Sequence, residues 1–245
     1  MIKGIIFDLG HTLVQLTRNI DEVAREGAET LASWYLKKKH VKLDQTALIE
    51  TFLAERDRGW ELANQTHVEV LATQTLRDTL DKIEAPPATK TKVMLEAAIK
   101  TYFEPEQAAW QVYVDTIETL NLLKQQGYRL GLYSNASDDR LIQRLVNENR
   151  LRPHLSITFS SAGWGWRKPK PEPFELIANR WELLPEEIVV VGDTLNADIL
   201  GAQNAGMPGI LVTMRESPSN DDNRHIKPTA TAERLSALPG LIANL

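Results

Sequence analysis

Five short segments of the chain are almost continuously apolar and rich in β-branched residues, which is the pattern of buried β-strands. They are residues 2–7, 129–133, 156–159, 188–191 and 210–213. Because the apolar residues follow one another instead of alternating with polar ones, both faces of each strand are expected to be buried, as in a parallel sheet. The sequence therefore predicts a central parallel sheet.

Segments with helical spacing lie between these strands. Residues 115–126 carry Ile117, Leu120 and Leu123 on one side, and Gly127 stands where a helix commonly ends. Similar patterns cover residues 138–149, 173–181 and 197–205. Regular alternation of strand and helix predicts an α/β fold with a doubly wound parallel sheet.

Residues 16–110 break this alternation, because they contain no convincing strand. Helical patterns cover residues 20–39, 44–64, 68–83 and 89–102. A helical block placed directly after the first strand predicts an inserted cap domain over residues 16–110, with residues 1–15 and 111–245 forming the α/β core domain. The polar residues 215–228 are predicted to form a mobile surface loop.

Composition narrows the classes of function. The 28 Lys and Arg residues against 33 Asp and Glu give the 245-residue chain a net charge of −5, which argues against a general nucleic-acid binder. The absence of cysteine excludes disulfides, thiolate nucleophiles and zinc–thiolate sites. No apolar run is long enough to cross a membrane, and the opening apolar stretch is too short for a signal peptide. We expect a soluble, cytoplasmic protein without a membrane partner.

Chemically capable side chains occur directly after the predicted strands or just before a helix. They are Asp8, Ser134, Asn135, Lys168, Asp193 and Asp198. Each type alone is common in turns and helix caps. In a doubly wound sheet, however, ligands bind beyond the carboxyl ends of the strands. Together these residues therefore indicate one site at that edge.

The same residues fall into four motifs. Asp8-Leu9-Gly10-His11-Thr12 follows the first strand, and Ser134 follows the second. Lys168 lies in a Lys-Pro-Lys-Pro stretch, and Gly192-Asp193 precedes Asp198. In this order and spacing the chain resembles the haloacid dehalogenase superfamily, over residues 8 to 198. The helical insert also falls where one large branch of that superfamily carries its cap.

The resemblance implies a magnesium-dependent phosphatase that acts on a small phosphorylated metabolite. Asp8 would be the nucleophile and would form an aspartyl-phosphate, which splits hydrolysis into two steps. Mg²⁺ would be held by Asp8, Asp193 and the backbone carbonyl of Gly10, with Asp198 as a nearby or water-bridged carboxylate.

The resemblance also implies how the substrate is held. Ser134, the backbone near Asn135, and Lys168 would bind the transferring phosphoryl group. Thr12 is expected to support the turn that aims the nucleophile.

Residue 10 departs from the pattern, because most phosphatases of the superfamily carry a second Asp there that serves as acid and base. Such a group is typically worth about 10²–10⁴-fold in rate, and Gly10 has no side chain to replace it. His11 or an acid from the cap could take over, or the substrate could have a good leaving group. Alternatively, the protein could be a weakened catalyst that binds a phosphorylated ligand or a protein partner.

Two other branches of the superfamily also lack this Asp. Dehalogenases generally abandon the metal and the Gly-Asp form of the fourth motif, which this chain keeps. Phosphonate-cleaving members use a cap lysine as a Schiff base, for which the candidates are Lys37, Lys38, Lys39 and Lys42. The cap would set substrate specificity, and residues that could line it or its entrance are Arg18, Arg56, Arg58, Trp60, Trp110, Trp164 and Trp166.

Overall fold

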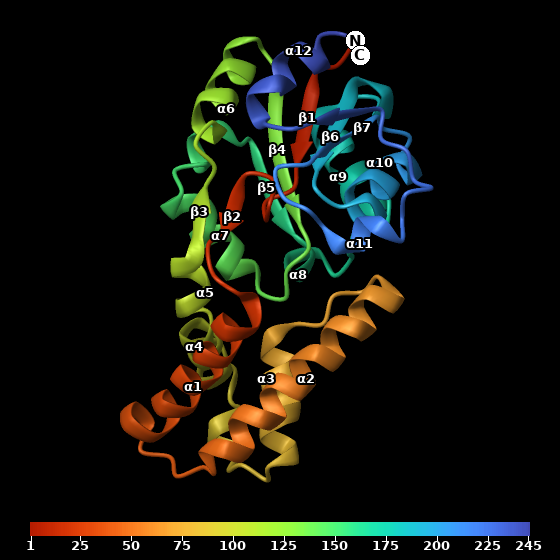
Figure 1. Cartoon of the computed structure of the whole chain (residues 1–245). Helices are drawn as coiled ribbons and strands as arrows, with labels where there is room; N and C mark the ends of the chain where they lie inside the picture. Colours follow the sequence, from red (N-terminus) through yellow and green to blue (C-terminus); the bar gives the residue numbers. More distant parts are fainter.

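A six-stranded, fully parallel sheet forms the centre of the computed structural model, which describes residues 1–245 apart from the side chain of Lys38 (Figure 1). Across the sheet the strands are β5 (Ile157–Ser160), β4 (Arg129–Ser134), β1 (Gly4–Phe7), β6 (Ile188–Gly192), β7 (Gly209–Val212) and β8 (Ala230–Ala232). All five predicted strands are present and the α/β class is confirmed. The sixth strand, β8, was not predicted, because Ala230-Thr231-Ala232 carries no apolar run.

The two faces of the sheet pack against different helices. Ile5 and Phe7 face a core shared with α6 (Thr116–Gln125), α7 (Asp139–Glu148) and α12 (Leu238–Ile242). Ile6 faces the opposite core, with α9 (Glu172–Trp181) and α10 (Leu200–Asn204). Burial of consecutive residues on both sides explains why the strands read as continuous apolar runs.

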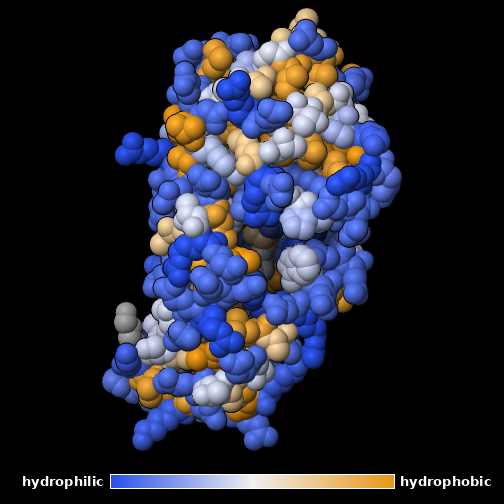
Figure 2. Space-filling view, viewed as in Figure 1, coloured by the Kyte–Doolittle hydropathy of each residue, from blue (hydrophilic) through white to orange (hydrophobic). Residues whose placement is uncertain are grey.

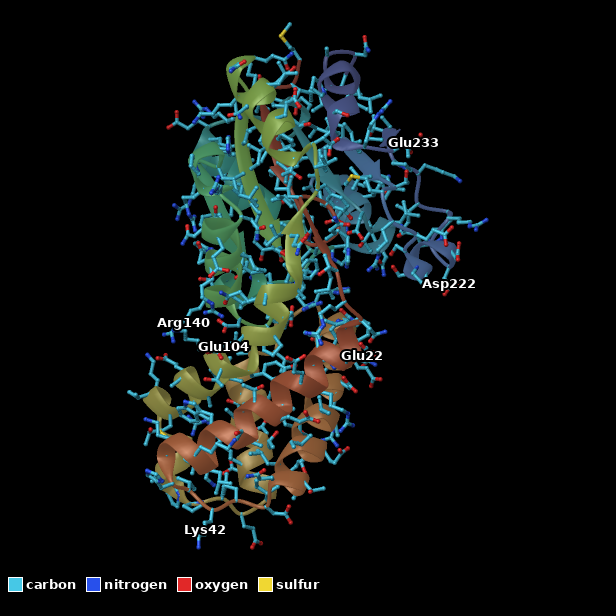
Figure 3. The ribbon with its side chains drawn as sticks, turned by 60° about the vertical axis from the view of Figure 1, so that its left-hand side comes forward. Glu22, Lys42, Glu104, Arg140, Asp222 and Glu233 are labelled. Carbon is cyan, nitrogen blue, oxygen red and sulfur yellow. The ribbon has the colours of Figure 1, made fainter. Side chains whose placement is uncertain are left out.

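Five helices and the segments that connect them, here called the helical block, gather at one end of the molecule (Figure 1). They are α1 (Ile20–Lys39), α2 (Gln45–Thr66), α3 (Ala72–Lys82), α4 (Lys92–Tyr102) and α5 (Glu104–Ala109). The side chain of Asn19 caps α1 by accepting hydrogen bonds from the main-chain nitrogens of Asp21 and Glu22. Lys42 lies at the far end of the block (Figure 3).

Two helices of the block begin later than the sequence predicts. The predicted start of α3 at residue 68 is wrong, because Val68 forms an antiparallel bridge with Trp166 and the helix begins only at Ala72. The predicted start of α4 at residue 89 is also wrong. Pro87–Lys90 forms a separate 3₁₀ turn, and Thr91 then caps α4 through the main-chain nitrogen of Met94.

A small antiparallel pair of strands, which the sequence did not predict, joins the helical block to the rest of the chain. In it, β2 (Val14–Leu16) pairs with β3 (Trp110–Val112), and Leu16 lies opposite Trp110. Near this pair α7 approaches the block, where Nε of Arg144 donates a hydrogen bond to Oε1 of Gln107 in α5. Arg140 forms an ion pair of 3.0 Å with Glu96 of α4. None of the described helices has the length and apolar character needed to span a membrane.

Candidate active site

The carboxyl edge of the sheet brings the predicted residues together, as expected. Strand β1 lies between β4 and β6, with Phe7 paired to both Leu132 and Val191. Because these three strands are in register, the residues that follow them emerge at the same level. Asp8 therefore lies near Asp193 and Asp198, and each of the three offers a carboxylate oxygen within 4.8 Å of the other two.

Lys168 connects two of these carboxylates. Its Nζ lies 2.6 Å from Oδ1 of Asp8 and 2.6 Å from Oδ1 of Asp198, and donates to the main-chain oxygen of Tyr133 at 3.1 Å. Burial alone would lower the pKa of Lys168, but the carboxylates of Asp198 and Asp8 outweigh it and raise the pKa. Lys168 therefore carries a positive charge at neutral pH.

The three buried carboxylates carry more charge than this one lysine can neutralise. Burial raises the pKa of Asp193, and the negative charges of Asp198 and Asp8 raise it further. Burial likewise raises the pKa of Asp198, although the nearby Lys168 opposes the shift. An excess of buried oxygen ligands with raised pKa values is the environment in which a hard divalent cation is favoured.

The two carboxylates after β6 differ in how many of their oxygens accept hydrogen bonds from protein groups. Asp198 receives Lys168 on Oδ1 and the main-chain nitrogen of Thr194 on Oδ2 at 3.0 Å. Asp193 accepts a hydrogen bond on Oδ1 from the hydroxyl of Thr194 at 3.0 Å. Asp193 is therefore better placed to give an oxygen to a cation.

Ser134 and Asn135 lie on the other side of Asp8. Ser134 ends β4, is buried and lines the cavity described below. The side chain of Asn135 accepts from the main-chain nitrogen of Lys168 at 2.9 Å and donates to its main-chain oxygen at 3.1 Å. The Asn135 side chain thus fixes the backbone that carries Lys168. The main-chain nitrogen of Asn135 remains the predicted donor to the phosphoryl group.

The turn after Asp8 is held by main-chain hydrogen bonds. The nitrogens of Thr12, Leu13 and Val14 all donate to the oxygen of Leu9, at 3.3, 2.9 and 3.1 Å. The hydroxyl of Thr12 is buried and makes no hydrogen bond to any described group. Thr12 therefore supports the turn through its backbone.

The ring of Trp110 packs against Gly10, beside the position that a Cβ of residue 10 would take. A Cβ added to Gly10 would lie 3.2 Å from the nearest carbon of the Trp110 ring, and Gly10 does not have the positive φ that favours glycine. The indole Nε1 of Trp110 in turn donates to Oε1 of Glu106 at 3.2 Å. The departure at Gly10 is therefore matched by an aromatic ring packed against it.

His11 is poorly suited to replace the missing acid. Burial and the guanidinium of Arg215 lower the pKa of His11 to about 4, so the imidazole is neutral at pH 7. Its Nε2 lies 2.7 Å from Nη1 of Arg215, and a guanidinium can only donate, so the ring proton is on Nδ1. Nδ1 is buried and has no hydrogen-bond partner among the described groups.

These residues open into a cavity of about 650 Å³ between the sheet edge and the helical block, and Figure 2 shows the surface hollowed there. Arg56, Trp60 and Trp110 line it, in agreement with the sequence, and Glu69, Glu106, Arg167 and Arg215 were missed. The predicted candidates that are not among its lining residues are Arg18, Arg58, Trp164 and Trp166. Lys168 is the only lysine among the described side chains that line it, and the side chain of Lys38 lies outside the described residues.

The polar segment 215–228 contributes to the site, although the sequence indicated only a mobile surface loop. It contains α11 (Pro218–Asp221), and Arg215, Ser217 and Ser219 line the cavity. The side chain of Asn220 accepts from the main-chain nitrogen of Leu195 at 2.7 Å and donates to the oxygen of Asp193 at 2.8 Å. Asn220 therefore fixes the turn that carries Asp193.

Comparison with known proteins identifies the class. The family model of the haloacid dehalogenase-like hydrolases matches residues 2–206, and the chain belongs to this family of hydrolases. Its motifs are therefore those of an enzyme.

Two of the relatives that the chain resembles are named as phosphatases. The chain is 29% identical over 232 residues to a glyceraldehyde 3-phosphate phosphatase of Methanopyrus kandleri, with 91% of each protein covered. It is 26% identical over 226 residues to a phosphoglycolate phosphatase of Salmonella typhimurium, covering 86% of this chain and 81% of that protein.

Solved structures share the fold. A 2-haloacid dehalogenase from Pseudomonas syringae superimposes with a TM-score of 0.72 at 23% identity, covering 100% of this chain and 99% of the other. A phosphatase of the same superfamily from Thermococcus onnurineus superimposes with a TM-score of 0.67 at 19% identity, covering 98% of both chains. At these identities the likeness concerns the architecture alone.

Proposed function

We propose that the protein is a magnesium-dependent phosphohydrolase that cleaves a small phosphorylated molecule through a phosphoryl–Asp8 intermediate. The observation that carries the proposal is the buried cluster of Asp8, Lys168, Asp193 and Asp198 facing a cavity of about 650 Å³. The phosphatase names of its relatives support this reaction. In this proposal the helical residues 16–110 act as a cap domain that recognises the rest of the substrate.

The reaction proceeds in two displacements at phosphorus. In the first, a carboxylate oxygen of Asp8 forms a bond to phosphorus, and the bond from phosphorus to the leaving oxygen breaks. In the second, water attacks phosphorus, the bond to Asp8 breaks, and phosphate is released. The hydroxyl of Ser134, the main-chain nitrogen of Asn135 and the ammonium group of Lys168 hold the phosphoryl oxygens throughout.

The donor set fits Mg²⁺, which prefers one or two carboxylates together with phosphate oxygens and water. Asp8 and Asp193 would be its side-chain ligands and Gly10 its backbone ligand, with Asp198 further out because protein groups occupy both of its oxygens. When bound, the cation neutralises negative charge on the phosphoryl group and on the carboxylates.

Replacing Asp193 by Asn is expected to weaken Mg²⁺ binding about 100-fold, because one of few anionic ligands becomes neutral. Asp198→Asn should weaken it only about 10-fold, since Asp198 acts on the cation indirectly. Calorimetric titration of chelator-treated protein with Mg²⁺ measures both. Equal losses in the two variants would show that the ligands are misassigned.

The proton for an alkyl leaving group must come from a residue other than Gly10. Among the described residues, the helical block lines the cavity with two carboxyl groups, Glu69 and Glu106. Glu69 is held by Arg167 and Ser161. Burial raises the pKa of Glu106, although the hydrogen bond from Trp110 opposes the shift, so Glu106 retains a proton more readily. Glu106, rather than His11, is the first acid to test.

We expect aryl phosphates to react faster than alkyl phosphates, because a phenolate leaves without protonation and an alkoxide does not. Gly10→Asp should raise turnover of alkyl phosphates more than of aryl phosphates. The gain should stay below the roughly 10²–10⁴-fold of a well-placed acid, because the Trp110 ring must shift to admit the new side chain. Steady-state rates on both substrate types measure the effect.

Gly10→Ala is the matched control, because it adds the Cβ that meets Trp110 without adding a carboxyl group. If both variants lose activity equally on every substrate while remaining folded, another group already transfers the proton. Glu106→Gln in the otherwise unchanged protein then identifies it through a selective loss on alkyl phosphates.

A panel of phosphorylated metabolites, assayed with Mg²⁺ and with chelator, tests the proposed function. Glyceraldehyde 3-phosphate and phosphoglycolate belong in it because of the relatives. The competing function is a non-catalytic module that binds a phosphorylated ligand. Such a module would hold the ligand for hours in a calorimeter without releasing phosphate, whereas the enzyme consumes it.

A further inference from the structure

A second buried ion pair lies beside the cavity, where the helical block meets the rest of the chain. Nη1 of Arg167 lies 2.7 Å from Oε2 of Glu69, and Nη2 of Arg167 donates to Oδ1 of Asn64 at 3.1 Å. The side chain of Glu69 is 2% exposed and that of Arg167 is 10% exposed. The reaction described above uses neither charge.

Main-chain hydrogen bonds surround this ion pair. The nitrogen of Glu69 donates to the oxygen of Gly165 at 2.8 Å, and the nitrogen of Arg167 donates to the oxygen of His67 at 3.0 Å. A further bond of 2.9 Å runs from the nitrogen of Ala72 to the oxygen of Ser137. The segment between α2 and α3 is thus attached to the sheet-bearing part, away from β2 and β3, which lie on the opposite side in Figure 1.

Glu69 reaches both loops that hold the phosphoryl group. Its partner Arg167 directly precedes Lys168 in the chain. Oε2 of Glu69 also accepts a hydrogen bond of 2.5 Å from the hydroxyl of Ser161. The oxygen of that hydroxyl in turn accepts a hydrogen bond of 2.8 Å from the main-chain nitrogen of Ala136. Ala136 follows Ser134 and Asn135. The Glu69 carboxylate is therefore connected to both loops, directly to the neighbour of Lys168 and through Ser161 to the neighbour of Asn135.

Burial of such a pair is not explained by stability alone, because the cost of removing two charges from water offsets much of their attraction. What the pair does supply is a fixed geometry that exists only while the block rests on the sheet edge. We propose that Glu69 is a positioning residue, which latches the helical block over the cavity and thereby sets the places of Lys168 and of the Ser134–Asn135 loop. This inference rests on the proposed phosphatase function of the same site.

The latch has a consequence for catalysis that differs from that of a merely structural ion pair. When the latch is closed, both phosphoryl-holding loops are in place. When it opens, Glu69 and Arg167 become hydrated and substrate or product can pass. Loss of the latch should therefore lower kcat and shift the block towards the open arrangement, even where the charges remain balanced.

The absence of cysteine from the chain makes this shift directly measurable. Spin labels on Glu61→Cys of α2 and Asp222→Cys, beyond α11, report the distance between the helical block and the sheet-bearing part. Both side chains are exposed. The distance is recorded in three proteins that carry this cysteine pair: the otherwise unchanged chain, Glu69→Gln, and Glu50→Gln. The last removes an exposed ion pair with Arg25 inside the block and is the matched control.

We expect Glu69→Gln to add a longer component to the distance distribution and to lower kcat on an aryl phosphate about 10–100-fold, as expected when reacting groups are misplaced by about 1 Å. Glu50→Gln should change neither quantity. The double variant Glu69→Gln/Arg167→Gln removes both charges, so it has no unpaired buried ion and is expected to fold, but it should remain open and slow.

Recovery of both the closed distance and kcat in the double variant would overturn the inference, because the pair would then serve only charge balance. An unchanged distance distribution in Glu69→Gln would overturn it as well. The distance measurement does not depend on turnover, so it still tests the latch if the chain hydrolyses no phosphate, a result that would instead refute the proposed function.

Discussion

Replacing Asp8 by Asn is expected to lower kcat by about 10⁴-fold or more, because an amide oxygen is too weak a nucleophile to form the covalent intermediate. The change is nearly isosteric, so the fold should be retained. Asp8 lies 2.6 Å from Nζ of Lys168, and the amide oxygen can still accept that hydrogen bond. Phosphate release with a saturating aryl phosphate and Mg²⁺ measures the loss.

Asp81→Asn is the matched control, because Asp81 is an exposed carboxylate of the helical block that pairs with Lys90. It should match the unchanged chain in both kcat and KM. Retention of more than about a tenth of the activity in Asp8→Asn would exclude Asp8 as the nucleophile.

Replacing Lys168 by Met is expected to affect activity and stability together. In the proposed reaction the phosphoryl group loses a charged donor, which should lower kcat about 10²–10³-fold. The carboxylates of Asp8 and Asp198 lose their buried partner, and breaking such a pair costs about 3–5 kcal/mol in the free energy of unfolding. Urea unfolding without metal measures the second effect, and saturating Mg²⁺ should recover part of it because the cation binds the folded state.

Lys90→Met provides the comparison, since the ion pair of Lys90 with the exposed Asp81 should contribute no more than about 1 kcal/mol. If Lys168→Met were as stable as Lys90→Met in the absence of metal, the buried carboxylates would not depend on Lys168 for compensation. The description of Lys168 as the buried partner that partly neutralises these carboxylates would then be wrong.

Much of the fold could be predicted from the sequence, because strands that are buried on both faces have continuous apolar runs. Residues 188–191 are apolar without interruption, as expected for a strand with neighbours on both sides. The three-residue strands β2, β3 and β8 could not be predicted in this way, because Val14-Gln15-Leu16, Trp110-Gln111-Val112 and Ala230-Thr231-Ala232 contain no continuous apolar run. Likewise, Val68 lies in a segment with helical spacing, but in the structure it pairs with Trp166.

The cluster that we propose as catalytic could be predicted because its members each follow a strand or precede a helix, where chain order determines position. Asp8, Asp193 and Asp198 meet as expected. Partners that depend on tertiary contact could not be found in this way. Asn220 comes from a segment with an ordinary loop composition, and Glu69 becomes notable only once Arg167 is seen beside it.

The most direct test of the central claim is the covalent state of Asp8 during turnover. With Gly10 in place of the usual base, hydrolysis of the intermediate should be slow enough for it to accumulate. Protein quenched in acid while it hydrolyses an aryl phosphate with Mg²⁺ should yield, by mass spectrometry, one phosphoryl group on the peptide that contains Asp8. Steady phosphate release with no phosphoryl group on Asp8 at any quench time, together with an active Asp8→Asn variant, would contradict the account.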